Sequence, residues 1–221
     1  MKRLVFVAVA LLLFPAVSSG QGMMRLYRAM YSVSGSYSSG RTDTDLKFPT
    51  ATAGTEFSYE SIQLATRSGA FVTRSLLLGV ELDWYSRRGE IKPSPNPSNQ
   101  RARQFDRELF LGPLLRWYQP MTVRWFVYPE VAVGYQHALG EYEESDATSS
   151  TLPATTTASG VGLFAGAGLG YFLTRNLVLD ATIRYSHRWL EGSYEVAGQP
   201  DIDAEISGGD VSVLVGFQLL M

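Results

Sequence analysis

The 221-residue chain contains no cysteine, so it can form neither a disulfide framework nor a thiolate metal site. It has only two histidines, His137 and His187. It also lacks a long basic run and any basic patch interleaved with aromatic residues, and its formal net charge is −2. These absences argue against nucleic acid as a partner.

Long apolar runs are lacking as well. The apolar run Leu4–Phe14 has 11 residues, whereas a helix needs about 20 apolar residues to span a bilayer. It follows the basic Lys2 and Arg3 and precedes the small-residue stretch Ala16–Gly20, which is the layout of a secretory signal peptide. We therefore predict a cleaved signal peptide over residues 1–20, rather than a membrane anchor, and a single domain over residues 21–221.

What the chain does have is strict alternation of side-chain type. Between Arg124 and Gln136, apolar residues that begin with Trp125 and end with Tyr135 alternate with a second set that includes Glu130. A strand sends alternate side chains to opposite faces. The ten residues from Trp125 to Tyr135 extend about 33 Å, and a tilt of about 40° reduces this to about 25 Å, the apolar height of an outer-membrane barrel. The segment therefore reads as a strand that crosses a membrane.

The same alternation recurs along the chain. It marks eight segments, at residues 25–37, 57–70, 74–87, 104–118, 123–137, 159–173, 176–189 and 206–220. Short connections at 71–73, 119–122 and 173–175 alternate with long polar connections at 38–56, 88–103, 138–158 and 190–205. Short turns at one end and long loops at the other are typical of outer-membrane barrels. We predict an all-β fold: an eight-stranded antiparallel up-and-down transmembrane β-barrel with four long outer loops.

Aromatic residues of the outward parity fall near both ends of the predicted strands. A soluble β-sandwich with core aromatics is the alternative, but it does not require aromatics at both ends with aliphatics between them, as a membrane barrel does. The predicted membrane girdles consist of Trp84, Trp117, Trp125, Tyr135, Tyr171, Tyr185 and Phe217.

The opposite parity carries charge of both signs. Opposite charges in a narrow lumen are expected to pair, because an unpaired buried charge is costly. A structural salt-bridge plug is favoured over a proton or ion path, because eight strands leave an interior that side chains can fill. Arg184 is expected to have a carboxylate partner, and the glycines of segment 159–173 to make room for inward rings. The predicted interior polar network consists of Glu81, Arg116, Glu130, Asp180, Arg184 and Asp210, and Arg67 and Asp83 share its parity.

Two prolines, Pro113 and Pro129, fall within neighbouring predicted strands. Proline donates no hydrogen bond to a ladder. Both lie eight residues from position 121 in the intervening turn, so we predict that they sit opposite each other. The missing bonds, worth about 1 kcal/mol each, would then be concentrated at one place.

Catalytic patterns are weak. Ser186, His187 and Glu191 suggest a hydrolase triad, but adjacent strand residues point to opposite faces, so Ser186 and His187 cannot readily bond. The His-x-Ser-Asn motif of outer-membrane lipid A deacylases fails after His187, because Trp189 and Leu190 occupy its last two positions. We predict no catalytic, cofactor-binding or metal-binding residues. The acidic cluster at residues 141–146 is interpreted as a solvated loop rather than a calcium site.

Four stretches carry a family resemblance. Leu111–Tyr118, Tyr128–Tyr135, Gly166–Leu173 and Asn176–Leu179 resemble the "GPFxRYY", "ExGxGY" and "GxGYFLxxNLxL" stretches of the small eight-stranded outer-membrane β-barrel family (OmpA/OmpX-like). The resemblance implies residence in the outer membrane of a Gram-negative bacterium, and insertion by the barrel-assembly machinery, which reads the last strand. That strand usually ends in an aromatic residue; here it ends Phe217–Met221.

The expected function is non-enzymatic: a structural or surface-interaction role in the cell envelope through the outer loops. Expected partners are outer-membrane lipid and lipopolysaccharide, whose phosphates Arg87, Arg88, Arg101 and Arg103 are placed to contact, and an extracellular partner of the loops. The alternative is a narrow pore or carrier for small or hydrophobic solutes. A soluble lipocalin-like carrier is disfavoured, because it would line its cavity with apolar residues and this interior face is charged.

Overall fold

The computed structural model describes residues 27–47, 52–94, 101–145, 154–196 and 201–221; the predicted signal peptide lies outside these residues. In this part of the chain no helix has the length and apolar character needed to cross a membrane. The strands are β1 (Ala29–Lys47), β2 (Thr52–Phe71), β3 (Leu76–Ser94), β4 (Arg101–Trp117), β5 (Gln119–Pro120), β6 (Trp125–Ser145), β7 (Ala154–Phe172), β8 (Leu177–Val196) and β9 (Ile202–Leu220).

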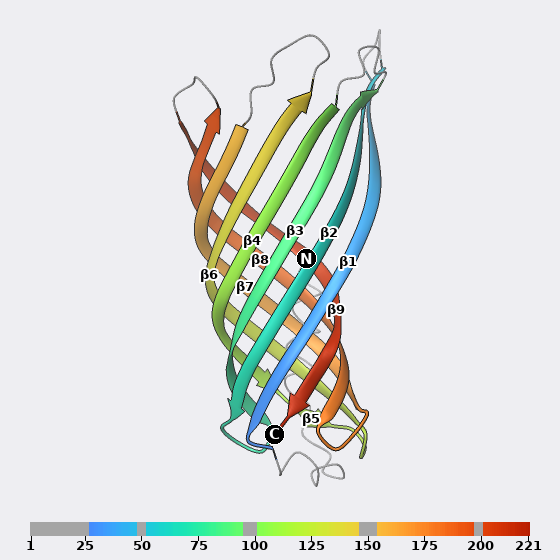
Figure 1. Ribbon diagram of the computed structural model, residues 1–221, viewed down its shortest axis with the longest axis vertical. Helices are drawn as coiled ribbons and strands as arrows, with labels where there is room; N and C mark the ends of the chain where they lie inside the picture. The colour runs from blue at the N-terminus through green and yellow to red at the C-terminus, as the bar shows by residue number, and fades with distance from the viewer. Residues whose placement is uncertain (1–26, 48–51, 95–100, 146–153, 197–200) are drawn as a thin grey trace.

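All the strands belong to one antiparallel sheet that closes on itself. Each long strand pairs with the next, β4 pairs with β6, and β1 pairs with β9 to complete the ring. The two-residue β5 also pairs with β6 and continues the line of β4 beyond Tyr118. The result is a tilted barrel of eight wall strands (Figure 1), which confirms the predicted eight-stranded up-and-down fold.

The strands run farther than the alternation predicts. β1 and β2 pair from Ala29 opposite Ala70 to Lys47 opposite Thr52, so most of the predicted loop 38–56 is strand. The predicted loops 88–103, 138–158 and 190–205 likewise lie mostly within β3–β4, β6–β7 and β8–β9. The prediction of four long loops is therefore wrong. Polar, Ser/Thr-rich composition does not identify a loop here, because Thr favours paired strands and a hairpin above the lipid can be hydrated on both faces.

The outward face is apolar, with aromatic residues toward both of its ends. Near the short turns, Trp125 packs on Tyr171 with ring centroids 4.6 Å apart. Phe217 on β9 is also exposed on this outward face. Farther along their strands Trp84, Tyr135 and Tyr185 point outward and are exposed. We call the set near the short turns (Trp117, Trp125, Tyr171, Phe217) the lower girdle and the other three the upper girdle.

The two prolines do not lie opposite each other. In the β4–β6 register Arg116 pairs with Glu130 and Leu114 with Ala132, which places Pro113 and Pro129 at separate heights. The ladder is interrupted twice among these described residues, once around Pro113 and once around Pro129, where β4 ends and β5 begins. The prediction is wrong because the turn is centred two residues later than position 121. Each interruption therefore contains one proline, and the loss of hydrogen bonds is spread over two places.

Candidate functional site

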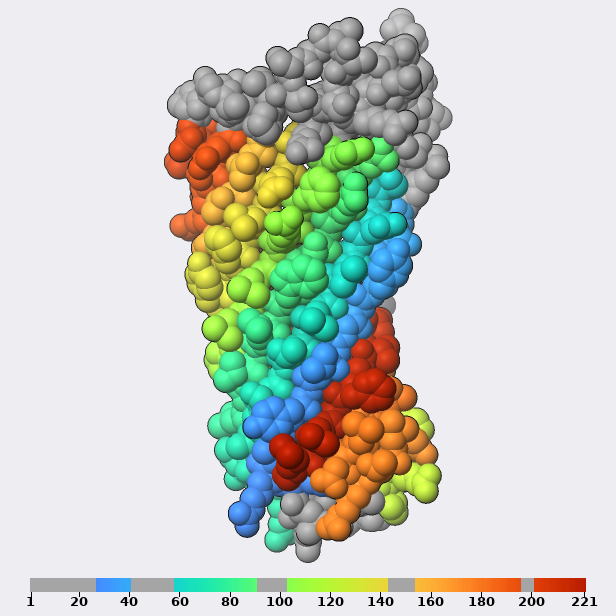
Figure 2. All heavy atoms as spheres, viewed as in Figure 1, coloured from blue at the N-terminus to red at the C-terminus, as the bar shows by residue number. Residues whose placement is uncertain are grey.

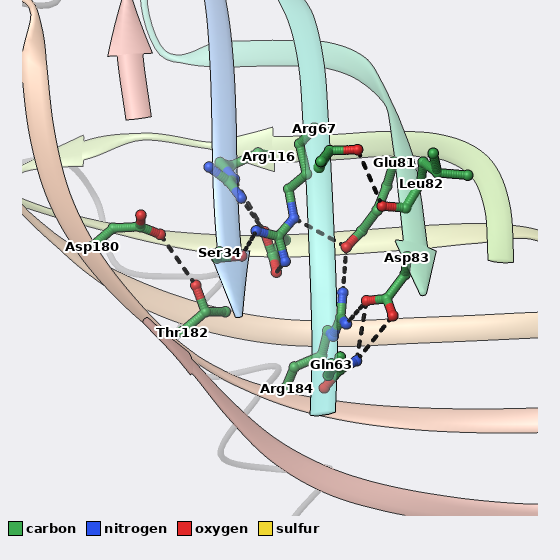
Figure 3. A network of polar contacts seen from close by, with 12 residues as sticks. Ser34, Gln63, Arg67, Glu81, Leu82, Asp83, Arg116, Asp180, Thr182 and Arg184 are labelled. Atoms are coloured by element: carbon green, nitrogen blue, oxygen red, sulfur yellow. Dashed lines mark hydrogen bonds and ion pairs between the residues drawn. The ribbon is translucent and has the colours of Figure 1, made fainter. Parts of the chain in front are cut away.

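The middle of the barrel interior is filled by an ion network of three arginines and three carboxylates, namely Arg67, Arg116, Arg184, Glu81, Asp83 and Glu130. Alternation on β2, β3, β4, β6 and β8 turns these side chains inward, and all six are buried. Figure 3 shows five of them, Arg67, Glu81, Asp83, Arg116 and Arg184, pointing toward one another. The formal charges of the six balance, which is the condition for burying so many of them.

Arg184 and Arg67 share one carboxylate. Arg184 donates through Nη1 to Glu81 and through Nη2 to Asp83, so it has the carboxylate partner expected from the sequence. Arg67 donates through Nε to Glu81 Oε1 at 3.0 Å and through Nη1 to Ser34 Oγ at 2.7 Å. These four bonds link β8 to β3, β3 to β2 and β2 to β1 across the lumen.

Arg116 binds on the other side of the network. Its Nε and Nη2 both donate to Glu130 Oε2, at 3.0 and 2.5 Å, and its guanidinium lies 4.2 Å from the ring centroid of Tyr128. Arg67 Nη2 lies 3.7 Å from Glu130 Oε1, which joins the two halves. Charge-assisted bonds and cation–π contacts of this kind are strong in a desolvated interior.

The predicted interior residues separate into three places. Glu81, Arg116, Glu130 and Arg184 meet in the ion network. Asp180 is buried beside it and accepts a hydrogen bond of 2.5 Å from Tyr128 Oη. Asp210 does not join the network.

Asp210 instead lies nearer the outer rim. Its carboxylate is 4.0 Å from Arg188 Nη2, and its side chain is 69% exposed. Counting residues from the short turns places Asp210 level with Arg184 and Glu130, but in the β8–β9 register Arg184 lies opposite Ser212 and Asp210 opposite Ser186, so Asp210 is two residues farther toward the outer end.

Several interior residues lie beyond the predicted set. Arg67 and Asp83 complete the charge balance, and Gln63 Nε2 donates to both oxygens of Asp83 at 3.2 and 3.1 Å. All three residues have the inward parity in the predicted strands, and this parity could have identified them from the sequence. Tyr118 shares the inward parity of Arg116 within the predicted segment 104–118, so the same signal was available for it, although it lies between β4 and β5 in the structure.

An aromatic cluster closes the lumen below the ion network. Tyr118 and Phe126 are fully buried with centroids 5.3 Å apart, and Phe126 meets Phe172 at 5.3 Å. The cluster is completed by Tyr27, Phe71 and Tyr128. Glycines on β7 make room for these rings: a β-carbon at Gly168 would collide with the ring of Tyr128, and one at Gly170 with that of Phe126.

The two histidines do not form a catalytic constellation. His187 lies on the outward face between Tyr185, whose hydroxyl is 3.1 Å from Nδ1, and Trp189, whose ring centroid is 4.2 Å away. Ser186 donates to the Asp210 carbonyl at 3.4 Å. His137 Nδ1 lies 2.8 Å from Ser159 Oγ. Among the residues that the structure describes, no group of three or more His, Asp or Glu side chains is arranged to hold a metal ion.

The interior and the wall together define an outer-membrane type of β-barrel, and the comparisons agree at the level of the fold. No protein-family model matches the chain, and no curated protein matches it. Among solved structures it is similar to the outer membrane protease OmpT of Escherichia coli, with 7% identity over 89% of this chain and 97% of that one and a TM-score of 0.53.

A second similar structure is a major outer membrane protein of Thermus thermophilus, with 14% identity over 87% of this chain and 99% of that one and a TM-score of 0.52. OprG of Pseudomonas aeruginosa matches with 15% identity over 90% of this chain and 99% of that one, at a TM-score of 0.48. The first two matches confirm that the chain has the fold of an outer-membrane β-barrel.

Proposed function

We propose that the protein is a non-enzymatic integral β-barrel of the outer membrane of a Gram-negative bacterium, with a structural and surface-contact role in the cell envelope. The observation that carries this proposal is the filled lumen. Arg116, Tyr118 and Phe126 are fully buried, and they belong to two successive layers that occupy the interior. A barrel closed in this way acts through its surfaces rather than through a channel.

The surface role is assigned to the outer ends of the hairpins. β3 continues ten residues past Trp84 to Ser94, and β4 accompanies it above the upper girdle. Arg87 donates to Asp106 at 2.9 and 2.6 Å, and Arg88 lies 5.2 Å from the ring centroid of Phe105. These contacts stiffen a polar platform suited to lipopolysaccharide phosphates or an extracellular partner. Insertion by the barrel-assembly machinery is part of the same proposal.

Electrical recording tests the filled lumen. We expect the refolded protein in a planar bilayer to give no steady current, because the ion network and the aromatic cluster leave no continuous water path. The variant Arg116→Ala/Tyr118→Ala removes one side chain from each layer and is expected to show channel openings. The matched control Leu115→Ala/Trp117→Ala alters the exposed neighbours on the same strand and should stay silent.

A steady current from the unaltered protein would contradict this proposal. It would favour the alternative function, a narrow pore or carrier for small or hydrophobic solutes.

A further inference from the structure

The barrel wall is incompletely paired at one seam. β1 and β9 pair over six residues only, from Met30 opposite Leu220 to Gly35 opposite Val215. Continuing the same register would place Ser38 opposite Ser212, but no pairing is present there between the described strands, although both continue toward the outer end. Figure 1 shows β1 and β9 side by side near the C-terminus and diverging above, and Figure 2 shows their atoms adjoining in the lower part of that face.

The seam begins within the lipid-facing part of the wall. Val213 and Val211 on β9 and Tyr37 on β1 all point outward and are 53%, 71% and 65% exposed. Unpaired backbone N–H and C=O groups are strongly disfavoured in hydrocarbon, which offers them no hydrogen-bond partner. The edges of this seam therefore favour contact with water or with a polar ligand over contact with lipid tails.

A cavity of about 430 Å³ lies behind the seam, above the ion network. We call it the outer cup. Its floor contains Phe110 and Phe164, whose centroids are 4.2 Å apart, and its wall carries hydroxyls from Ser36, Ser38 and Ser212. Residues of both seam edges, outward ones included, line the cup, so it opens sideways toward the outer leaflet.

The charge of the outer cup is set by Asp210. The other charged residues that line it are held by short bonds: Asp83 to Arg184, Glu108 to Arg188, and Arg87 to Asp106. Asp210 is 4.0 Å from Arg188 Nη2, and the other terminal nitrogen of Arg188, Nη1, already donates to Glu108. The seam therefore presents one weakly compensated carboxylate in a cavity that Tyr37 and Tyr85 also line.

We propose that the outer cup binds the amine headgroup of a single-tailed amphiphile, which enters from the outer leaflet through the β1–β9 seam. The ammonium bonds to Asp210 and lies among the serine hydroxyls and tyrosine rings, which favour a cation. The tail leaves through the seam and lies along Val211 and Val213. The ion network beneath the cup stops the ligand from passing farther, so the cup is a binding site and not a route across the membrane.

This reading is favoured over addition of a protein strand to the seam. A strand would need only the two backbone edges. The cup behind them, its aromatic floor and the carboxylate at its mouth match a small ligand instead. This binding site goes beyond the proposed function. A structural barrel with a filled lumen needs no ligand at the seam, so the proposed function would hold whether or not the outer cup binds one.

Calorimetric titration of the refolded protein in maltoside micelles tests the site, with dodecylamine as the probe. We expect saturable binding, at least about tenfold tighter than that of dodecyl sulfate, which has the same tail and the opposite charge. Asp210→Asn should weaken amine binding by about tenfold or more. The control Asp203→Asn changes an exposed carboxylate on the same strand outside the cup and should leave the affinity unchanged.

Cysteine pairs test the seam, since the chain has no native cysteine. Ser38 and Ser61 are cross-strand neighbours with their hydroxyls 2.7 Å apart, so Ser38→Cys/Ser61→Cys is expected to oxidise readily. Ser38→Cys/Ser212→Cys, across the seam, is expected to remain reduced, because these two positions are not paired with each other. Equal oxidation of both pairs, equal affinity for both probes, or no effect of Asp210→Asn would overturn the proposal. So would a doubled protein mass in light scattering, which would mean that a second copy occupies the seam.

Discussion

Replacing Glu130 with alanine is expected to lower the free energy of unfolding by about 3–5 kcal/mol, the range found when one partner of a buried ion pair is removed. Glu130 accepts both bonds from Arg116 and is the only carboxylate within reach of Arg116 in the ion network as described. Its loss leaves a fully buried guanidinium without a counter-charge and removes the 3.7 Å contact with Arg67. Denaturant unfolding in lipid vesicles, followed by tryptophan fluorescence, measures the change.

Two further variants test whether the loss of stability in Glu130→Ala comes from the unpaired Arg116. Glu60→Ala, at an exposed position on β2, should change stability by less than about 0.5 kcal/mol. Arg116→Met/Glu130→Leu removes both charges of the pair and should recover much of the loss, because apolar replacement of a whole buried pair is often close to neutral. A Glu130→Ala variant as stable as Glu60→Ala would show that the ion network does not hold the barrel together.

Gly168→Ala is expected to destabilise the barrel by about 1–3 kcal/mol, the usual cost of overpacking a core. The added methyl group would collide with the ring of Tyr128, which is fully buried and held by bonds of 2.5 Å to Asp180 and 2.7 Å to Thr182. Because the hydroxyl end of the ring is fixed in this way, the ring cannot swing aside cheaply. The shift in the denaturant midpoint gives the effect.

The matched control is Gly208→Ala on β9, where an added β-carbon meets nothing within 4 Å. It should be neutral or stabilising, by up to about 1 kcal/mol, because alanine restricts the unfolded chain. In a Tyr128→Leu background the cost of Gly168→Ala should shrink by half or more. An unchanged cost there would assign the effect to backbone strain and not to the ring.

The fold could be predicted from the sequence because lipid and a filled lumen impose a period of two on every strand. Trp125, Val131 and Tyr135 face outward, and Phe126 and Glu130 face inward. The glycines opposite the inward rings, at 168 and 170, also follow from that parity. These features depend only on which face a residue occupies, and alternation reports the face directly.

The register of the strands and the positions of their ends could not be predicted as well from the sequence. The turn between β4 and β6 is centred two residues later than position 121, and a shift of this size keeps every side chain on its predicted face. Parity therefore could not reveal the error. The outer hairpin ends were missed for a related reason: above the lipid both faces are polar, so the alternation that marks a strand disappears although pairing continues.

The open seam had no local signal at all. Val211, Val213 and Val215 alternate as regularly as any strand residues in the chain, yet only Val215 has a partner on β1. Whether two strands pair depends on the meeting of segments more than 170 residues apart, from Gly35 to Val215, and neither segment encodes this by itself.

The short closure also sets the order in which the wall comes apart. The ring is sealed by six residue pairs and by the two bonds that Ala29 and Met221 exchange, N to O at 2.8 Å and 2.9 Å, whereas every other pair of neighbouring long strands shares 14 or more residue pairs among the described residues. Thermal opening of the barrel should therefore begin at this seal and travel into β9 before it reaches β7. The amides of β9 would then exchange with solvent first, and the pairing of the last residues of β9 with β1 would be what keeps the barrel closed.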